Sequence, residues 1–354
     1  FKSENRYEAK QDDFEKIPGS PIAYWISSKI LKLFQNNDFL GNIFESKQGM
    51  VTSDNDRFLK IWTEINIRKL GLNIKSVNDA KESSLKWFPY NKGGEYRKWY
   101  GNSEYVVNYE DDGFELKEFQ STLNQGWNVR LKSREYYFRD AVSWTDITTV
   151  GLSARYYNNG SIFDVSGHSS FFNNEEEMLG VLGLLNIKLS TDLSRLINPT
   201  LHFQVSDFRK MPYLNKFISS YRGHELTQEC IDISKEEWDS RETSWDFTKN
   251  ELLKHKLDSK IETAYNNYCS YWKEKFYKLH ANEEELNRLF IDIYELGDEL
   301  TPDVALKDIT ILKSESIIND NNELEFKSDE IMKQFISYAV GVMFGRYSLD
   351  KDGL

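Results

Sequence analysis

Cysteine is scarce in this sequence, with only Cys230 and Cys269 among 354 residues. Two distant cysteines exclude a disulfide framework, and with five scattered histidines they give no zinc-ligand spacing. No apolar run approaches the ~20 residues that a membrane-spanning helix needs, and the first residues show no signal-peptide pattern. Repeats and low-complexity tracts are also missing. We therefore expect a globular, cytoplasmic protein with no membrane partner.

The net charge of -12 argues at first against a nucleic-acid partner. Its distribution changes that argument. Residues 1–220 hold 28 Lys and Arg against 28 Asp and Glu, whereas residues 221–354 hold 17 against 29. The first part is neutral and can carry a local basic face, while the acidic second part is poorly suited to bind a phosphate backbone. The change in charge near residue 220 also predicts a domain boundary.

The spacing of apolar residues predicts an α+β fold, in which a mixed α/β domain precedes an all-helical domain. We expect a helical lead-in at residues 1–45, a mixed domain at 46–220 and an acidic helical domain at 221–354. Because the chain starts at Phe1, we also expect it to be a piece of a longer protein. Short β-type runs are predicted at residues 105–109, 136–138, 147–150 and 161–165.

Helices are predicted where capping residues precede periodic apolar residues. Asn173 and Asn174 can cap a helix over 175–188, and an apolar stripe over 253–279 predicts another. That stripe is not a strict heptad, so burial is favoured over a coiled-coil or partner-binding face. Asn282 with Glu285 resembles the start of a further helix. A short strand at 309–312 and a last helix at 329–344 complete the prediction.

One run, KWFPYNKGGEYRKWYGN at residues 86–102, combines flat aromatic rings, positive charges and two adjacent glycines. Such a combination suits a polyanion that carries bases. Gly93 and Gly94 break regular structure and allow a close backbone approach. The residue types alone fit a β-rich core segment with a charged turn equally well, so the run by itself leaves both interpretations open.

Three other motifs are weak candidates for catalysis. Asn198-Pro199 lacks the second proline and the aromatic residue of amino-methyltransferases, and no glycine-rich loop for S-adenosylmethionine follows an early strand. Pro302-Asp303 with Glu325 and Lys327 is a poor match to a metal-dependent nuclease site. His168 follows a glycine and precedes two serines, but no carboxylate at a recognisable spacing accompanies it, so a turn histidine is favoured. We therefore expect neither a catalytic residue nor a metal site.

Several segments together resemble a known family. They are GMVTSDNDRFL at 49–59, the run at 86–102, FRDAVSWT at 138–145, FDVSGH at 163–168, NEEELNRLFIDIYELGDELTP at 282–302 and SYAVGVMFGRYSLD at 337–350. This pattern resembles the carboxyl-terminal part of PglX, the adenine-specific DNA methyltransferase family of BREX phage defence, related to type IIG restriction–modification enzymes. The resemblance covers nearly the whole chain.

The resemblance implies an upstream methyltransferase domain that uses S-adenosylmethionine, and a target recognition domain in this chain that itself holds no cofactor. Related recognition domains often open with a Gly-x-x-Thr-Gly-x-Asn-like loop. Gly49, Thr52 and Asn55 match that loop, and Ser53 replaces its second glycine. An extended stretch that ends at Met211-Pro212 fits the closing pattern of such domains. The implied partners are duplex DNA, the upstream domain and other phage-defence proteins.

Residues for DNA binding follow from the resemblance together with residue type. Lysine and arginine side chains are candidates for phosphate contacts or for reading guanine. Asparagines are candidates for reading adenine edges, and aromatic rings are candidates for stacking. The candidate set is Thr52, Asn55, Arg57, Tyr90, Asn91, Lys92, Gly93, Gly94, Arg97, Lys98, Trp99, Tyr100, Asn102, Arg130, Lys132, Arg134, Arg139 and His168. On this interpretation, replacing Arg97 and Lys98 by alanine weakens methylation and leaves the fold intact. The alternatives are a protein-interaction scaffold and a carbohydrate-binding module suggested by nine tryptophans and twenty tyrosines.

Overall fold

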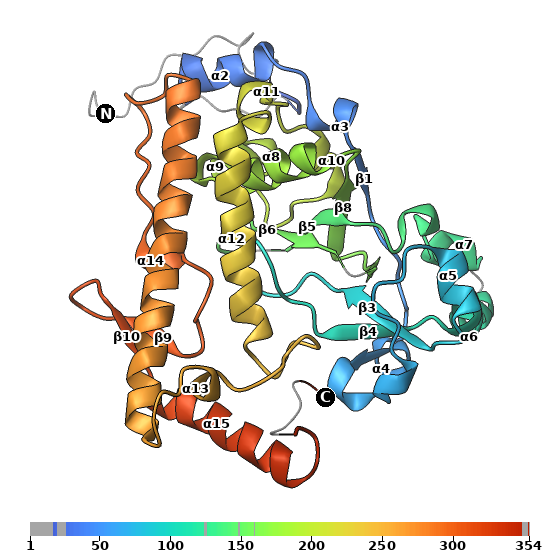
Figure 1. Ribbon diagram of the computed structural model, residues 1–354. Coiled ribbons are helices and arrows are strands. Elements are labelled where there is room, and N and C mark those ends of the chain that lie inside the picture. The colour runs from blue at the N-terminus through green and yellow to red at the C-terminus, as the bar shows by residue number, and fades with distance from the viewer. Residues whose placement is uncertain are drawn as a thin grey trace, which may run out of the picture.

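The computed structural model describes residues 17–19, 26–123, 126–147, 149–158, 160–348 and 353. Strands β1 to β8 form two four-stranded sheets in the middle of the molecule (Figure 1). The first sheet has the order β1-β8-β5-β6, and all its neighbours are antiparallel. Its strands are β1 Glu45–Lys47, β5 Ala141–Thr145, β6 Ala154–Tyr157 and β8 Gly167–Phe171.

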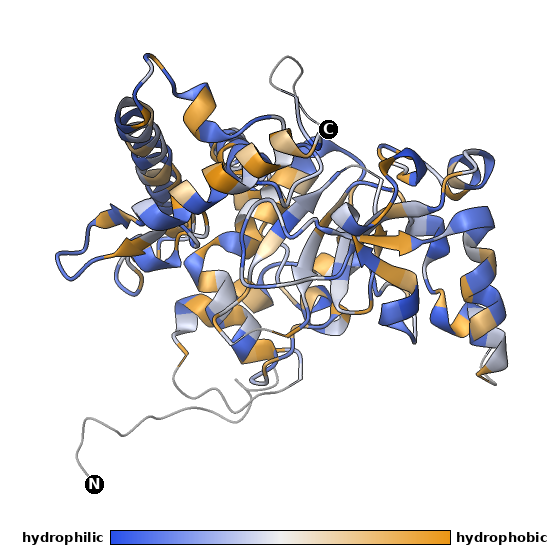
Figure 2. Ribbon diagram, turned by 90° about the horizontal axis from the view of Figure 1, so that it is seen from below, coloured by the Kyte–Doolittle hydropathy of each residue, from blue (hydrophilic) through white to orange (hydrophobic). Residues whose placement is uncertain are grey.

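The second sheet has the order β2-β4-β3-β7, with β3 and β7 parallel and the other pairs antiparallel. Its strands are β2 Leu59–Ile61, β3 Trp87–Asn91, β4 Tyr105–Asn108 and β7 Ile162–Phe163. Short helices, α4 Asn55–Phe58, α5 Val77–Glu82, α6 Glu110–Thr122 and α7 Trp127–Arg130, lie beside it on the right of Figure 1. These helices are mostly hydrophilic in Figure 2, as expected for elements with one face in water.

Longer helices cover the first sheet on its other side, on the left of Figure 1. α8 Glu175–Asn186 packs against β5, β6 and α12, and α12 packs along α14. The remaining helices are α2 Ser28–Gln35, α3 Leu40–Ile43, α9 Lys188–Ile197, α10 Val205–Arg209, α11 Asn215–Ile218, α12 Tyr221–Asp239, α13 Glu251–Lys254, α14 Ile261–Ile293 and α15 Ser328–Met343. Short 3-10 turns occupy Trp62–Glu64, Ile67–Lys69, Arg134–Tyr136 and Leu306–Asp308.

Two hydrophobic cores hold these layers together. The smaller core lies around the second sheet and contains Phe88, Tyr109 and Phe138. The larger core joins the first sheet to the helices through residues such as Trp144 and Trp272. Because the larger core continues across residue 220, no break in packing marks that position, and the three-domain division stays a prediction.

The α+β class is confirmed, but several predicted elements were wrong. The acidic second part is not all-helical, because β9 Ser316–Ile318 and β10 Leu324–Phe326 form a hairpin. Residue 136 ends a 3-10 turn and residues 137–138 follow it, so residues 136–138 form no strand. Ile147 makes an isolated bridge to His202, and residue 148 lies outside the described part. Residues 309–312 follow a 3-10 turn and form no strand.

The helix predictions fared better at the chain positions that carry clear caps. Asn174 accepts a hydrogen bond from the Glu177 amide at the start of α8, as predicted. Asn282, in contrast, lies inside the 33-residue α14, where its buried side chain donates to Glu229. Of the lead-in, α2 and α3 are present, whereas residues 1–16 and 20–25 lie outside the described part.

Candidate nucleic-acid interface

Six loops that are distant in the sequence meet along one line of the surface. They comprise residues 50–55, 92–95, 130–133, 145–147, 164–166 and 200–203, and we call this feature the loop ridge. The loops at 92–95, 145–147 and 164–166 follow the strands β3, β5 and β7, the loop at 50–55 lies between β1 and α4, and those at 130–133 and 200–203 follow the helices α7 and α9. Side chains at such loop tips are exposed while their backbone is held by the rigid strands behind them.

Backbone hydrogen bonds join each loop of the ridge to the next. The Val51 amide donates to the carbonyl of Arg130 at 2.9 Å, and the Val165 amide to the carbonyl of Met50 at 2.9 Å. The chain of contacts then continues through the bonds Asp164 N to Asn91 O at 2.9 Å, Asp146 N to Ser166 O at 3.1 Å and Phe203 N to Asp146 O at 2.7 Å. The ridge is therefore a continuous and well-supported surface.

Close packing and a left-handed residue shape the loop at 49–55. A Cβ at Gly49 would lie 1.9 Å from the Phe163 carbonyl oxygen, so only glycine fits there. Ser53, at the position of the second glycine, has φ 61°, in the left-handed region. Thr52 donates to the Asn55 side chain, and the amide of buried Gln120 donates to the carbonyl of Thr52 at 2.7 Å.

Because Ser53 occupies the left-handed region, its side chain should govern the stability of this loop. We expect Ser53→Val to lower the free energy of unfolding by about 1–2 kcal/mol relative to Ser53→Gly, since a β-branched residue is strongly disfavoured there. Urea unfolding of both variants measures the difference. Equal stabilities would contradict the left-handed conformation of this residue.

Part of the predicted site lies on this ridge. Asn55, Gly94 and Lys132 are exposed, and Lys92 and Arg130 are partly exposed. The Lys132 ammonium donates to Gln48 at 3.1 Å, and that of Lys92 lies 3.2 Å from Asp164. The Asn55 side-chain oxygen also accepts from Thr52 and the Gly94 carbonyl from Thr145, so part of the polar surface of these residues is used within the fold.

Other predicted residues are buried and act within the fold. Tyr90 donates to Asp164 at 2.6 Å, and Asn91 donates to Ser143 at 2.5 Å. Burial followed by the charge of Asp164 raises the pKa of Tyr90. Thr52 and Tyr100 are also buried. These side chains support the loops of the ridge from behind and have no surface to offer DNA.

His168 lies within β8 and is 1% exposed, so it is not the turn histidine that the sequence predicted. Its Nε2 lies 3.5 Å from Asp146, which also contacts His202 at 3.2 Å. Burial lowers the pKa of His168, and the opposing charge of Asp146 does not compensate. His168 therefore lies inside the fold beside the 145–147 loop.

Arg97, Lys98 and Trp99 point into the helical layer. Arg97 pairs with Glu237 of α12 at 2.7 Å, and Lys98 pairs with Glu283 of α14 at 2.7 Å. The indole of Trp99 donates to the second oxygen of Glu283 at 2.8 Å. These three side chains are almost entirely buried. They dock the sheets onto the helices and are not part of the predicted DNA-binding surface.

The Glu237 carboxylate gives this docking contact a pH dependence. Burial alone would raise the pKa of Glu237, but the charges of Arg97 and Arg241 outweigh it and hold the pKa below its usual value. A carboxyl whose folded pKa is lowered stabilises the fold above its unfolded pKa, and this contribution is lost as the pH falls through the folded value.

We therefore expect the stability advantage of the unmodified chain over Glu237→Gln to be full at pH 7 and to shrink below about pH 4. Chemical unfolding across a pH series measures it. An advantage that is unchanged between pH 7 and pH 3 would contradict this assignment.

The remaining predicted residues lie at the surface away from the ridge or brace it. Arg57 pairs with Glu115 at 2.7 Å, and Arg134 pairs with Asp112. Arg139 lies over the rings of Tyr136 and Phe171 at the opposite end of β5. Asn102 donates to the carbonyls of Gly93 and Glu95, which makes it a support of the ridge rather than a reader.

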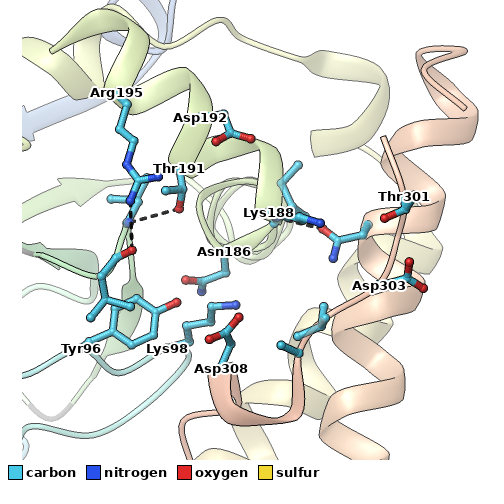
Figure 3. Close-up of a pocket in the computed structure, with 16 residues that line it drawn as sticks. Tyr96, Lys98, Asn186, Lys188, Thr191, Asp192, Arg195, Thr301, Asp303 and Asp308 are labelled. Atoms are coloured by element: carbon cyan, nitrogen blue, oxygen red, sulfur yellow. Dashed lines mark hydrogen bonds between the residues drawn. The ribbon is translucent and has the colours of Figure 1, made fainter. Parts of the chain in front are cut away.

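A cavity of about 580 Å³ lies between the loop after β3, the loop before β6, α9 and the segment at 301–308 (Figure 3). Tyr96 and Lys98 line one side of the cavity, and Lys188, Asp192 and Arg195 line it from α9. Burial raises the pKa of Asp192. Because Asp303 and Asp308 also face this cavity, it offers no uniformly positive surface to a phosphate backbone.

No helix among the described residues has both the length and the apolar character needed to cross a membrane. Within the same residues, His, Cys, Asp and Glu form no group of three or more that could hold a metal ion. Asn198 lies in a turn in which its amide donates to Asp207 and its oxygen accepts from Thr200. Its polar atoms are thus occupied within the fold.

The described residues also do not fit S-adenosylmethionine. Nucleotide cofactors of this kind are held in the crevice of a doubly wound parallel sheet, whereas here only β3 and β7 pair in parallel within the two four-stranded sheets. No chemical step is derived from this cofactor for the chain.

Comparison with known proteins places this surface in a family context. The chain is 39% identical over 357 residues to the "Adenine-specific methyltransferase PglX" of Lacticaseibacillus casei (strain Zhang). It is 35% identical over 351 residues to the "Adenine-specific methyltransferase BrxX" of Escherichia coli O9:H4 (strain HS). The predicted resemblance to the PglX family is confirmed.

The match covers 98% of this chain with PglX and 97% with BrxX, but the chain spans only 28% and 27% of the lengths of these relatives. Most of each relative therefore lies outside the matched region. No protein-family model matches the chain.

Sequence reasoning missed several residues that shape the ridge. In the run at 86–102 the cations dominate the sequence signal, and Glu95, whose exposed carboxylate lies beside the two glycines, gives none of its own. Arg155 and Thr145 lie in ordinary strand patterns, and nothing in the sequence marks them as supports of a loop some fifty residues away. Only the folded chain brings them together.

Proposed function

We propose that this chain is the target-recognition part of a site-specific adenine DNA methyltransferase of phage defence. It reads and clamps duplex DNA while a separate catalytic domain transfers the methyl group from S-adenosylmethionine to an adenine. The observation that carries the proposal is the loop ridge, where hydrogen-bonded loops present Asn55, Lys92, Arg130 and Lys132. Recognition from loops on a rigid scaffold is typical of binding proteins.

The chemistry of the ridge suits duplex DNA. Arginine and lysine bind phosphates and guanine edges, and asparagine matches an adenine edge. The charges of Arg130 and Lys132 have no carboxylate partner among the described residues.

Salt dependence of DNA binding tests the proposal. In the full-length enzyme, we expect the logarithm of the affinity for duplex DNA to fall linearly with the logarithm of salt concentration, with a slope of about -0.9 for each phosphate contacted. Binding that is absent or insensitive to salt between 50 and 200 mM would contradict it. A surface that does not bind DNA shows neither this salt dependence nor a sequence preference.

A protein-interaction scaffold is the second candidate, because α15 carries an exposed apolar stripe. Ile336, Val340, Met343 and Phe344 lie on one face and are 44–86% exposed. Exposed apolar stripes of this kind mark contacts with other proteins. Replacing Met343 and Phe344 by serine separates the candidates, since it should disturb a protein complex and leave DNA binding unchanged.

A further inference from the structure

The loop at residues 93–96, which we call the glycine loop, is held from the inside by side chains. Three successive carbonyl oxygens accept hydrogen bonds from neighbouring segments. The bonds are Arg155 Nη2 to Gly93 O at 3.1 Å, Thr145 Oγ1 to Gly94 O at 3.2 Å and Asn102 Nδ2 to Glu95 O at 2.9 Å. Tyr96 then anchors the loop in the cavity behind it. The loop is therefore rigid, although its two glycines both have positive φ.

Pinning the carbonyls fixes the direction of the amides. In a trans peptide the N–H points opposite to the C=O of the same unit, and this chain has no cis peptide among its described residues. The N–H groups of Gly94, Glu95 and Tyr96 therefore point away from the supporting side chains. None of the three has an acceptor within the described part of the chain. They are three neighbouring donors without an internal acceptor, and two of their residues, Gly94 and Glu95, are exposed.

Arg155 is the central support of this arrangement. Its guanidinium is fully buried and, among the described residues, pairs with no carboxylate. It donates to the carbonyl of Arg97 at 3.0 Å and to Thr145 at 2.9 Å, in addition to Gly93. Burying an unpaired charge is costly. Such a cost is consistent with a residue that holds both ends of the loop in one conformation.

Glu95 gives the loop its one charged side-chain acceptor. Its side chain is exposed at the tip and meets no cation among the described residues. A second carboxylate, Glu104, lies nearby, and burial followed by the charge of Glu95 raises its pKa. A phosphate group would be repelled by these two carboxylates. The loop therefore suits a neutral base edge better than the DNA backbone.

We propose that the glycine loop reads a G·C base pair in the major groove, and that Glu95 is a specificity-determining residue that accepts from the amino group of cytosine. A G·C pair presents two acceptors, guanine N7 and O6, and one donor, cytosine N4. Two of the outward amides and the Glu95 carboxylate match that pattern. This inference rests on the proposed function and adds to it the base pair and the residue that reads it.

Mapping the methylated sites of the full-length enzyme by sequencing tests the inference. We expect Glu95→Ala to relax one G·C position of the recognised sequence, with discrimination there falling about tenfold to hundredfold. Glu95→Gln should move the preference at that position toward adenine, because glutamine matches the N6 and N7 edge. Thr145→Val, which removes one support of the loop, should relax the same position.

Glu118→Gln is the matched control, since it removes an exposed carboxylate of α6 that lies off the ridge. It should leave both the recognised sequence and the methylation rate unchanged. Melting temperatures within a degree or two of the unmodified enzyme verify that each variant is folded.

Two outcomes would overturn the inference: an unchanged recognised sequence in Glu95→Ala and Glu95→Gln, or relaxation at an A·T position instead of a G·C position. If the Glu95 variants keep the recognised sequence unchanged while DNA binding still depends steeply on salt, only this inference fails. If salt-dependent DNA binding is absent altogether, the proposed function fails with it.

Discussion

Replacing Arg97 and Lys98 together by alanine is expected to destabilise the fold by several kcal/mol. Lys98→Ala strands the buried carboxylate of Glu283 in α14, whereas Arg97→Ala removes one of the two arginines that pair with Glu237 in α12. Breaking a buried ion pair by removing one partner costs about 3–5 kcal/mol, because the remaining charge is left uncompensated. This outcome corrects the expectation from the sequence that the double variant keeps its fold and loses only DNA contacts.

The Lys98 pair should dominate that effect. Burial alone would lower the pKa of Lys98, but the charge of Glu283 outweighs it and raises the pKa above its usual value. A group whose folded pKa is raised stabilises the fold below its unfolded pKa, so this contribution is fully present at pH 7. The contact joins the segment after β3 to α14, and its loss would loosen the sheets from the helices.

Chemical unfolding of the single and double variants measures the cost. Lys98→Met combined with Glu283→Gln should recover most of the stability lost in Lys98→Ala, because no buried charge is left and the glutamine oxygen still accepts from Trp99. Lys132→Ala, an exposed lysine on the ridge, is the control and should stay within about 0.5 kcal/mol of the unmodified chain. A double variant as stable as that control would refute the docking role.

Reversing two charges on the ridge should have the largest effect on DNA binding. We expect Arg130→Glu with Lys132→Glu to lower the affinity of the full-length enzyme for duplex DNA on the order of tenfold to hundredfold, and to reduce the salt slope by about 2. Stability should hardly change, because the bond from Val51 to residue 130 uses only the backbone carbonyl.

Lys256→Glu with Lys273→Glu makes the matched control, since both lysines are exposed in the acidic second part and lie off the ridge. The two double variants have the same net charge, so a general charge effect would weaken both. The ridge interpretation requires that only the variant with Arg130→Glu and Lys132→Glu loses affinity for DNA. Equal affinities for both variants would shift the proposed interface to another surface.

The elements that were predicted correctly are those with local signals. Asn174 caps α8 through its own side chain, and β4 contains two adjacent β-branched valines. The prediction at Asn282 was wrong because capping preference competed with burial. The apolar residues of α14 continue on both sides of Asn282, and packing against α12 outweighs the tendency of asparagine to start a helix.

The sequence by itself determined the α+β class, the neutral first part, the acidic second part and the resemblance to PglX, because composition and local pattern carry each of them. Only the tertiary structure decided which cations are available at the surface. Arg97 and Lys98 look like ideal DNA contacts, yet their carboxylate partners lie 140 and 185 residues further along the chain. An ion pair between such distant residues leaves no local pattern, so burial turns these two side chains into internal supports and leaves Arg130, Lys132 and Glu95 at the surface.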